Sequence, residues 1–316
     1  AEEVKGILLG MASGQETLLG YFRRFIRNFE KRVGINRTVG SLRAYRNAYN
    51  HIERFLQAQY KLSDIPFSAV DRSFIDKYDL YLRTERNLAP GTIINLTVQL
   101  KTIVGEAIAD GIITASPFMG YEPVRPKHVQ KYLTAEELHR IMTTPLHKQN
   151  LYHVRDMFLF SCFTGIPYGD MRLLTKDNLC LAEDGTWWIK SARQKTKIEF
   201  EIPLLDLPLQ ILKKYSGTAP GDKLLPMYCN STLNLYLKEI ARICHIDRPL
   251  VFHAGRHTYA TEITLSHGVP LETVSRMLGH SQIETTQIYA KVTDEKIDAD
   301  TKALNRKISE RFSVVI

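Results

Sequence analysis

Hydrophobic residues recur every three or four positions through the first third of the chain, which is the spacing of amphipathic helices. The first such run ends at Gly34, and the second begins after Thr38 and Ser41, either of which could cap a helix. The pattern predicts four helices, over about residues 18–33, 42–56, 71–83 and 90–110. We expect them to form one helical domain, residues 16–115.

The helical pattern stops between Ser116 and Lys131, where Pro117, Pro123 and Pro126 punctuate a basic stretch. Prolines at this density stiffen a connection and prevent a helix from forming. We therefore interpret residues 116–131 as a basic linker between two domains.

The pattern after the linker predicts a mixed domain, residues 132–316. Thr134 and Glu137 have the spacing of a capping box, so a helix should begin there, and an apolar helix should follow over about residues 152–163. From Thr186 to Leu205 the period changes: an apolar Trp-Trp-Ile run precedes a polar Gln-Lys-Thr-Lys turn, and apolar residues alternate with polar ones after the turn. The expected fold is mainly α with a small antiparallel sheet, an α+β arrangement in the second domain.

The composition is that of an ordinary globular protein, with 44% hydrophobic and 24% charged residues in 316 positions. No apolar run approaches the roughly 20 residues that span a bilayer, and the opening residues lack the features of a secretion signal. We expect a location in the cytoplasm. The four cysteines have no CxxC spacing, so we expect reduced thiols that fill the core.

The formal charge of +8 and the pI of about 9.2 suggest a polyanionic partner, although many metabolic enzymes carry a similar charge. Basic residues outnumber acidic ones on the first two predicted helices. They form either a solvated surface or a face that follows the phosphates of a nucleic acid. The candidates for DNA contact are Arg23, Arg24, Arg27, Arg43 and Arg46 on the helices, and Arg125, Lys127 and Lys131 in the linker.

The residues that suggest a chemical function lie between His253 and Tyr289. Phosphodiester transfer needs hydrogen-bond donors around the nonbridging phosphate oxygens, and the guanidinium of an arginine supplies two parallel N–H groups for this. His253 and Arg256 are three residues apart, so on a helical turn they face the same way, although alone such a pair could be a surface coincidence. His280 follows Gly279, and we expect it at a helix start where its ring can donate to a phosphate oxygen.

Two further residues complete this hypothesis. Lys195 lies in the polar hairpin turn, where its ammonium could protonate a departing 5′ oxygen; Lys197 is a competing candidate, and a solvated turn lysine is the simpler alternative. Tyr289 would be the nucleophile. Its pKa of about 10 must be overcome, and we expect the nearby cations to favour the phenolate.

In these motifs and their order the chain resembles the tyrosine recombinase family, also called the lambda-type phage integrase family, over nearly its whole length. The resemblance assigns the hairpin lysine to Lys195, the HxxR pair to His253 and Arg256, the second histidine to His280 and the nucleophile to Tyr289. It implies a two-domain C-shaped clamp, with a helical core-binding domain, that cleaves and rejoins DNA through a 3′-phosphotyrosyl intermediate. Neither ATP nor a divalent metal nor another cofactor is then required.

The resemblance also implies partners. Four protomers, monomeric when free, would act on two double-stranded attachment sites to integrate or excise a bacterial mobile element, with or without accessory DNA-bending proteins. The protein would then lie in the bacterial cytoplasm, at the nucleoid. Residues 1–15 are interpreted as a leader from an upstream arm-binding domain. The apolar end of the tail, Phe312 to Ile316, either docks on a neighbouring protomer, which we favour, or packs on its own chain or frays.

One position departs from the family pattern. The first catalytic arginine normally follows Thr-Gly-hydrophobic, but here Pro167 follows Thr164-Gly165-Ile166, while Asp170 still matches the supporting acid. Proline cannot donate to a phosphate. The chain is in this respect similar to integrases of mobile elements that lack this arginine, and we expect Arg172 or Arg193 to supply the missing charge.

Two alternatives remain open from the sequence. The first is a DNA-binding regulator that keeps the recombinase fold but has impaired strand cleavage, which the missing arginine would explain. The second is a zinc protein that uses Cys244, His245, His253 and His257, although these residues lack a recognised two-pair spacing.

Overall fold

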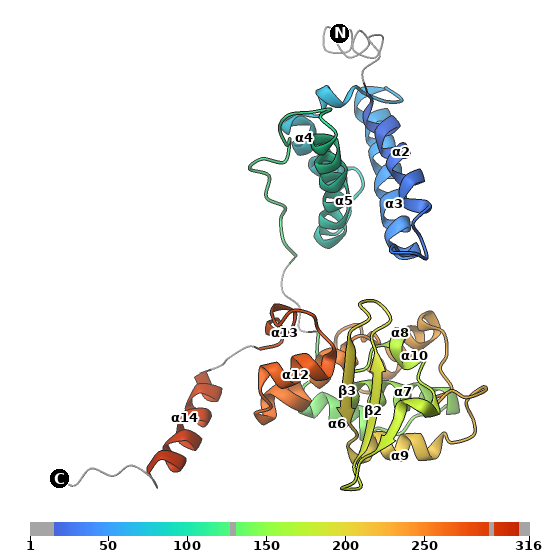
Figure 1. Cartoon of the computed structure of the whole chain (residues 1–316), viewed down its shortest axis with the longest axis vertical. Helices are drawn as coiled ribbons and strands as arrows, with labels where there is room; N and C mark the ends of the chain where they lie inside the picture. The colour runs from blue at the N-terminus through green and yellow to red at the C-terminus, as the bar shows by residue number, and fades with distance from the viewer. Residues whose placement is uncertain (1–15, 127–130, 291–293, 310–316) are drawn as a thin grey trace, which may run out of the picture. The chain divides into compact units, whose positions relative to one another are not determined.

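The computed structural model describes residues 16–126, 131–290 and 294–309. The chain divides into two compact units, Ala1–Val129 and Gln130–Ile316. The first is helical (Figure 1). Its elements are α2 (Leu18–Glu30), α3 (Val39–Phe55), the π-helical turn η1 (Leu56–Tyr60), the 3-10 turn η2 (Phe67–Ala69), α4 (Arg72–Thr84) and α5 (Pro90–Ala109). The predicted leader 1–15 and the linker residue Lys127 lie outside the described residues.

The caps of these helices agree with the sequence pattern. The Thr38 hydroxyl accepts a hydrogen bond from the Ser41 amide at 3.1 Å, so Thr38 rather than Ser41 caps α3. The Asp71 carboxylate accepts from the Phe74 amide at 2.7 Å and caps α4. The prediction of four helices is therefore confirmed, with a packed aromatic core in which the Phe55 ring contacts the rings of Phe74, Tyr78 and Tyr81.

The second unit combines helices with one small sheet (Figure 1). Its three strands are antiparallel in the order β1-β2-β3: β1 (Leu179–Leu181), β2 (Trp187–Ala192) and β3 (Glu199–Pro203). The hairpin β2-β3 was predicted, whereas β1 was not. The helical elements are α6 (Ala135–Thr143), α7 (Gln149–Thr164), α8 (Tyr168–Met171), η3 (Lys176–Asn178), α9 (Asp206–Lys214), α10 (Asn230–Ile243), α11 (Ala254–Thr258), η4 (Tyr259–Thr264), η5 (Leu265–His267), α12 (Leu271–Leu278), α13 (Glu284–Gln287) and α14 (Asp294–Ser309).

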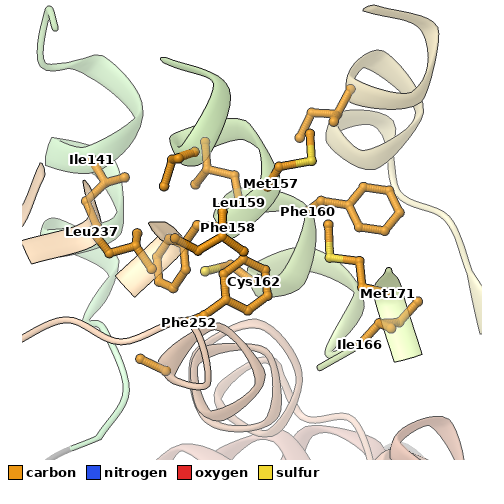
Figure 2. Packing of buried hydrophobic residues seen from close by; sticks show 14 of the residues in the cluster. Ile141, Met157, Phe158, Leu159, Phe160, Cys162, Ile166, Met171, Leu237 and Phe252 are labelled. Atoms are coloured by element: carbon orange, nitrogen blue, oxygen red, sulfur yellow. The ribbon is translucent and has the colours of Figure 1, made fainter. Parts of the chain in front are cut away.

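Helix α7 forms the centre of this unit because apolar side chains cover most of its circumference. Figure 2 shows Phe158 and Cys162 of α7 packed near Phe252, which precedes α11. Helix α11 approaches α7 at Gly255, where a Cβ atom would lie 2.8 Å from Ser161 Oγ. This close approach fixes the residues that flank Gly255 beside the end of α7.

Other expectations about this unit have mixed outcomes. The predicted capping box of α6 is present, with Thr134 and Glu137 bonded reciprocally. Cys162 and Cys244 are buried as expected, but Cys229 is exposed at the start of α10, so the prediction that all four cysteines fill the core is wrong.

Two searches of the described residues bear on the class of protein. None of the helices there is long and apolar enough to cross a membrane. The same residues contain no group of three or more His, Cys, Asp or Glu side chains that could hold a metal ion, so Cys244, His245, His253 and His257 do not assemble as the zinc alternative requires.

Candidate active site

Arg256 is the centre of the candidate site. It lies in α11, is only 3% exposed, and donates from Nη1 to the Gly165 carbonyl at 2.9 Å and from Nη2 to the Leu278 carbonyl at 2.7 Å. Gly165 ends α7 in the left-handed conformation, with φ of 70°. Burial and the charge of Arg193 lower the Arg256 pKa to about 10, which leaves the guanidinium protonated at neutral pH.

His280 lies against Arg256, but not at a helix start as expected. Helix α12 ends at Leu278, Gly279 is left-handed with φ of 64°, and the His280 amide donates back to the Ser275 carbonyl at 3.1 Å. His280 therefore follows a helix end, because glycine permits the backbone reversal that terminates α12.

The hydrogen bonds of His280 fix its tautomer. Its Nε2 lies 2.8 Å from Arg256 Nη2, and its Nδ1 lies 2.7 Å from Thr286 Oγ1. Because a guanidinium can only donate, Nε2 is the acceptor and Nδ1 carries the proton. Burial, followed by the charges of Arg256 and Arg193, lowers the His280 pKa to about 4. In this arrangement His280 Nε2 cannot donate to a phosphate oxygen, contrary to the expectation.

Tyr289 follows α13 and is only 7% exposed. Its ring packs edge-on against His257, with ring centroids 5.1 Å apart, and nearly parallel to the His280 ring at 6.3 Å. Burial raises the pKa of Tyr289, although a hydrogen bond from Arg256 and the charges of Arg256 and Arg193 lower it. The cations favour the phenolate as expected, but in the protein alone burial has the larger effect, so the net shift raises the Tyr289 pKa.

One histidine of α11, His257, contacts the nucleophile candidate, and a second histidine contacts His257. His253, the residue before α11, has its ring centroid 4.9 Å from that of His257. Burial and neighbouring positive charge lower the pKa of both rings, that of His257 to about 4. Sequence reasoning missed His257 as a site residue; its position one turn after His253 was the available signal.

The hairpin brings a second arginine to the site. Arg193, just after β2, lies with Nε 2.7 Å from Asp170 Oδ2 and donates from Nη1 to the Leu278 carbonyl at 2.9 Å. Leu278 O thus accepts from both Arg193 and Arg256. Arg172, by contrast, is exposed at the end of α8, and no hydrogen bond or ion pair among the described residues links it to this cluster.

Lys195 is exposed in the turn between β2 and β3. The turn is closed by backbone hydrogen bonds of 2.8 Å between Arg193 and Ile198 and between Lys197 and Arg193. The Gln194 amide donates to Asp170 Oδ1 at 2.9 Å, which ties the turn to α8. Among the described residues Lys195 has no recorded contact with Arg256 or Tyr289, so the structure leaves its role as a prediction.

The candidate DNA-contact residues fall into two groups. Three are already paired within the first unit: Arg23 with the Tyr49 hydroxyl, Arg24 with Glu16 and Arg46 with Glu30. The others within the described residues are exposed, and none has an ion pair recorded there: Arg27, Arg43, Arg125 and Lys131. The positive charge of Lys131 nevertheless lowers the pKa of His253 and His257, which places it near the candidate site.

Comparison with known proteins identifies two matching families. Residues 131–296 match the phage integrase family, and residues 17–123 match the phage integrase SAM-like domain. The chain is 25% identical to tyrosine recombinase XerD of Listeria monocytogenes, over 81% of this chain and 89% of that protein. It is 27% identical to tyrosine recombinase XerD of Staphylococcus saprophyticus, over 89% of this chain and 96% of that protein.

Solved structures share the fold at lower identity. The Tn1549 transposon integrase in complex with transposon right end DNA matches with a TM-score of 0.70 and 19% identity, over 92% of this chain and 99% of that one. A lambda integrase dimer bound to a core site matches with a TM-score of 0.70 and 18% identity, over 88% of this chain and 100% of that one.

Proposed function

The chain belongs to the phage integrase family and is a site-specific DNA recombinase, and from this premise we propose that Tyr289 is the residue that attacks DNA. One observation carries the proposal. Arg256 contacts His280 and shares the Leu278 carbonyl with Arg193, and its charge acts on the Tyr289 hydroxyl. A phenol is thus held among cationic donors, as phosphodiester cleavage requires.

In each step of the proposed reaction, one ester bond to phosphorus forms as another breaks, so the number of phosphodiester bonds does not change. The Tyr289 oxygen bonds to phosphorus, and the bond from phosphorus to the 5′ oxygen breaks. His253, whose lowered pKa keeps it neutral at pH 7, accepts the phenol proton, and Lys195 gives a proton to the departing 5′ oxygen. The free 5′ hydroxyl of a partner strand then attacks the 3′-phosphotyrosyl bond and releases Tyr289. Bond energy stays in the protein linkage, so the exchange needs no external energy source.

Arg256 acts directly on the negative charge that develops at phosphorus. A bound phosphate would draw the Arg256 charge that otherwise acts on the Tyr289 hydroxyl. His280 accepts from Arg256 and so orients the guanidinium. Loss of one such donor commonly lowers the rate about 100- to 1000-fold.

We further propose that the active assembly is a homotetramer on two attachment sites, formed from free monomers. A lambda integrase tetramer bound to a Holliday junction is among the solved structures with this fold. Helix α14 carries exposed Ile297, Leu304 and Ile308, which supports docking of the C-terminal region on a neighbour. The tail from Phe312 to Ile316 lies outside the described residues.

The proposed substrate is an attachment site of a bacterial mobile element, so we expect the protein to act at the nucleoid in the cytoplasm. Accessory DNA-bending proteins are an optional part of this proposal. The regulator alternative has weaker support, because Tyr289, Arg256 and His280 remain together in one connected site.

Covalent trapping tests the proposal. The protein is incubated with a library of nicked duplexes whose sequence is randomised around the nick, so that the short 5′-hydroxyl fragment diffuses away after cleavage. Covalent complexes are isolated under denaturing conditions, and the recovered sequence supplies a defined nicked duplex for later assays. We expect wild type but not Tyr289→Phe to form the complex. DNA binding without any covalent complex in wild type would instead favour the regulator.

A further inference from the structure

We propose that Arg193 takes the place of the missing family arginine and binds the scissile phosphate, and that Asp170 positions it. The proposal rests on the proposed function and names a further catalytic residue for the same reaction. Pro167 precedes α8 and has no side-chain donor, so the second guanidinium must come from another element.

Arg193 reaches the same point as Arg256 from a different element. Its Nη1 lies 2.9 Å from the Leu278 carbonyl oxygen, and Arg256 Nη2 lies 2.7 Å from that oxygen. The two nitrogens can therefore be no farther apart than the sum of these distances. Two guanidiniums this close can act on one phosphate group.

The site has more positive than negative charge. The Asp170 carboxylate faces Arg193 and also acts on Arg256, so one carboxylate serves two guanidiniums. Asp170 Oδ2 and Arg193 Nε are both buried and lie 2.7 Å apart, but their geometry does not satisfy a hydrogen bond. A phosphate would offset the remaining charge, and the Arg193 charge already lowers the pKa of His253, His280 and Tyr289.

Arg193 also has donors available for a ligand. A guanidinium carries five N–H groups. Nε faces Asp170 and Nη1 donates to Leu278, while no described residue is recorded as accepting from Nη2. The side chain is 15% exposed, so a phosphate can reach the open end of the fork.

The backbone around Arg193 accommodates this placement. A Cβ atom on Gly279 would lie 2.9 Å from Arg193 Cγ, so glycine leaves room for the aliphatic part of the side chain. Asp170 accepts the Gln194 amide through Oδ1 and faces Arg193 through Oδ2, which holds the end of β2 against α8. We therefore assign Asp170 as a positioning residue.

Cleavage of two versions of the nicked duplex tests this inference. One version carries the normal scissile phosphate, and the other carries a methylphosphonate, which lacks one negatively charged oxygen. On phosphate, Arg193→Ala should cleave about 100- to 1000-fold more slowly than wild type. On methylphosphonate, the loss should shrink to about tenfold or less, because the charge that Arg193 neutralises is absent. Arg172→Ala is the matched control and should cleave both substrates at the wild-type rate.

Asp170→Asn separates positioning from folding. Asparagine keeps an oxygen that can accept from the Gln194 amide but removes the ion pair with Arg193. We expect a smaller loss on phosphate than for Arg193→Ala, a recovery on methylphosphonate, and no additional loss in an Arg193→Ala background.

Several outcomes would overturn the inference. Equal losses on both substrates would mean that Arg193 or Asp170 has a structural role only, and wild-type cleavage by Arg193→Ala would mean that another group supplies the charge. If wild type forms no Tyr289-dependent covalent complex on the phosphate substrate, the proposed function itself fails. If wild type forms this complex but the Arg193 and Asp170 variants give the results above, only the role of Arg193 fails.

Discussion

Gly279→Ala perturbs the contact between the end of α12 and Arg193 without removing a charged group. Gly279 has φ of 64°, and a Cβ there would lie 2.9 Å from Arg193 Cγ and 3.3 Å from Phe200 Cβ. Left-handed backbone costs a non-glycine residue about 1–2 kcal/mol. Overpacking adds about 1–3 kcal/mol, since neither contacted atom lies at the flexible end of its side chain.

Gly268→Ala is the matched control. Gly268 is also left-handed, with φ of 80°, but a Cβ there meets no atom within 4 Å. Gly268→Ala should therefore lower the free energy of unfolding only by the cost of the left-handed backbone, about 1–2 kcal/mol. The difference between the two variants isolates the clash with Arg193 and Phe200.

Two assays measure the result. Both tryptophans of the chain, Trp187 and Trp188, lie in β2, so their fluorescence during urea denaturation reports on the second unit. We expect Gly279→Ala to be less stable than Gly268→Ala by about 1–3 kcal/mol, and this difference to shrink in an Arg193→Ala background. Gly279→Ala should also cleave the nicked duplex far more slowly. Equal stability of the two variants with wild-type cleavage by both would refute the reasoning.

Three further predictions concern protonation, thiol reactivity and DNA binding. His280 and His257 have a pKa of about 4 in the folded protein against an ordinary value of 6.5, so the unfolded chain binds more protons than the folded one between pH 4 and 6.5. The free energy of unfolding should therefore fall as the pH decreases from 6.5 to 4. Thermal denaturation at several pH values should show a weaker dependence for His280→Gln than for wild type. The exposed Cys229 has a pKa of about 7, so iodoacetamide at pH 7.5 should modify it before the buried cysteines, as peptide mass spectrometry would show; equal modification of Cys162 in the native protein would contradict this. Arg43→Ala should reduce the salt dependence of DNA binding by about one unit of slope, whereas Arg24→Ala should reduce it less because Glu16 already pairs with Arg24; equal slopes would count against a phosphate-contacting role for Arg43.

The sequence predicted the helices and the hairpin because these depend on local patterns. Thr134 with Glu137, and Pro90 at the start of α5, are signals that act within a few residues. Strand β1 has only three residues, Leu179–Leu181, and it forms because β2 supplies the hydrogen-bonding partners. A segment so short carries too little periodicity to be predicted from its own residues.

The site was predicted as a set of residues but not as a geometry. The order of the motifs pointed to Arg256 and Tyr289. The tautomer of His280, in contrast, depends on hydrogen bonds with Arg256, which is distant in the sequence, and with Thr286, which lies in a separate helix. The raised pKa of Tyr289 depends on tertiary burial, which no local pattern contains. Our proposal of Arg193 rather than Arg172 likewise rests on the position of the Leu278 carbonyl, which no local pattern contains.

The central claim is that Tyr289 forms the covalent bond to DNA. Mass spectrometry of the covalent complex, after nuclease and protease digestion, tests it most directly, with DNA binding by Tyr289→Phe measured in parallel. We predict that the nucleotide is attached to Tyr289, and that Tyr289→Phe binds the nicked duplex but forms no covalent complex. A nucleotide attached to another residue, or a covalent complex that persists in Tyr289→Phe, would contradict the claim.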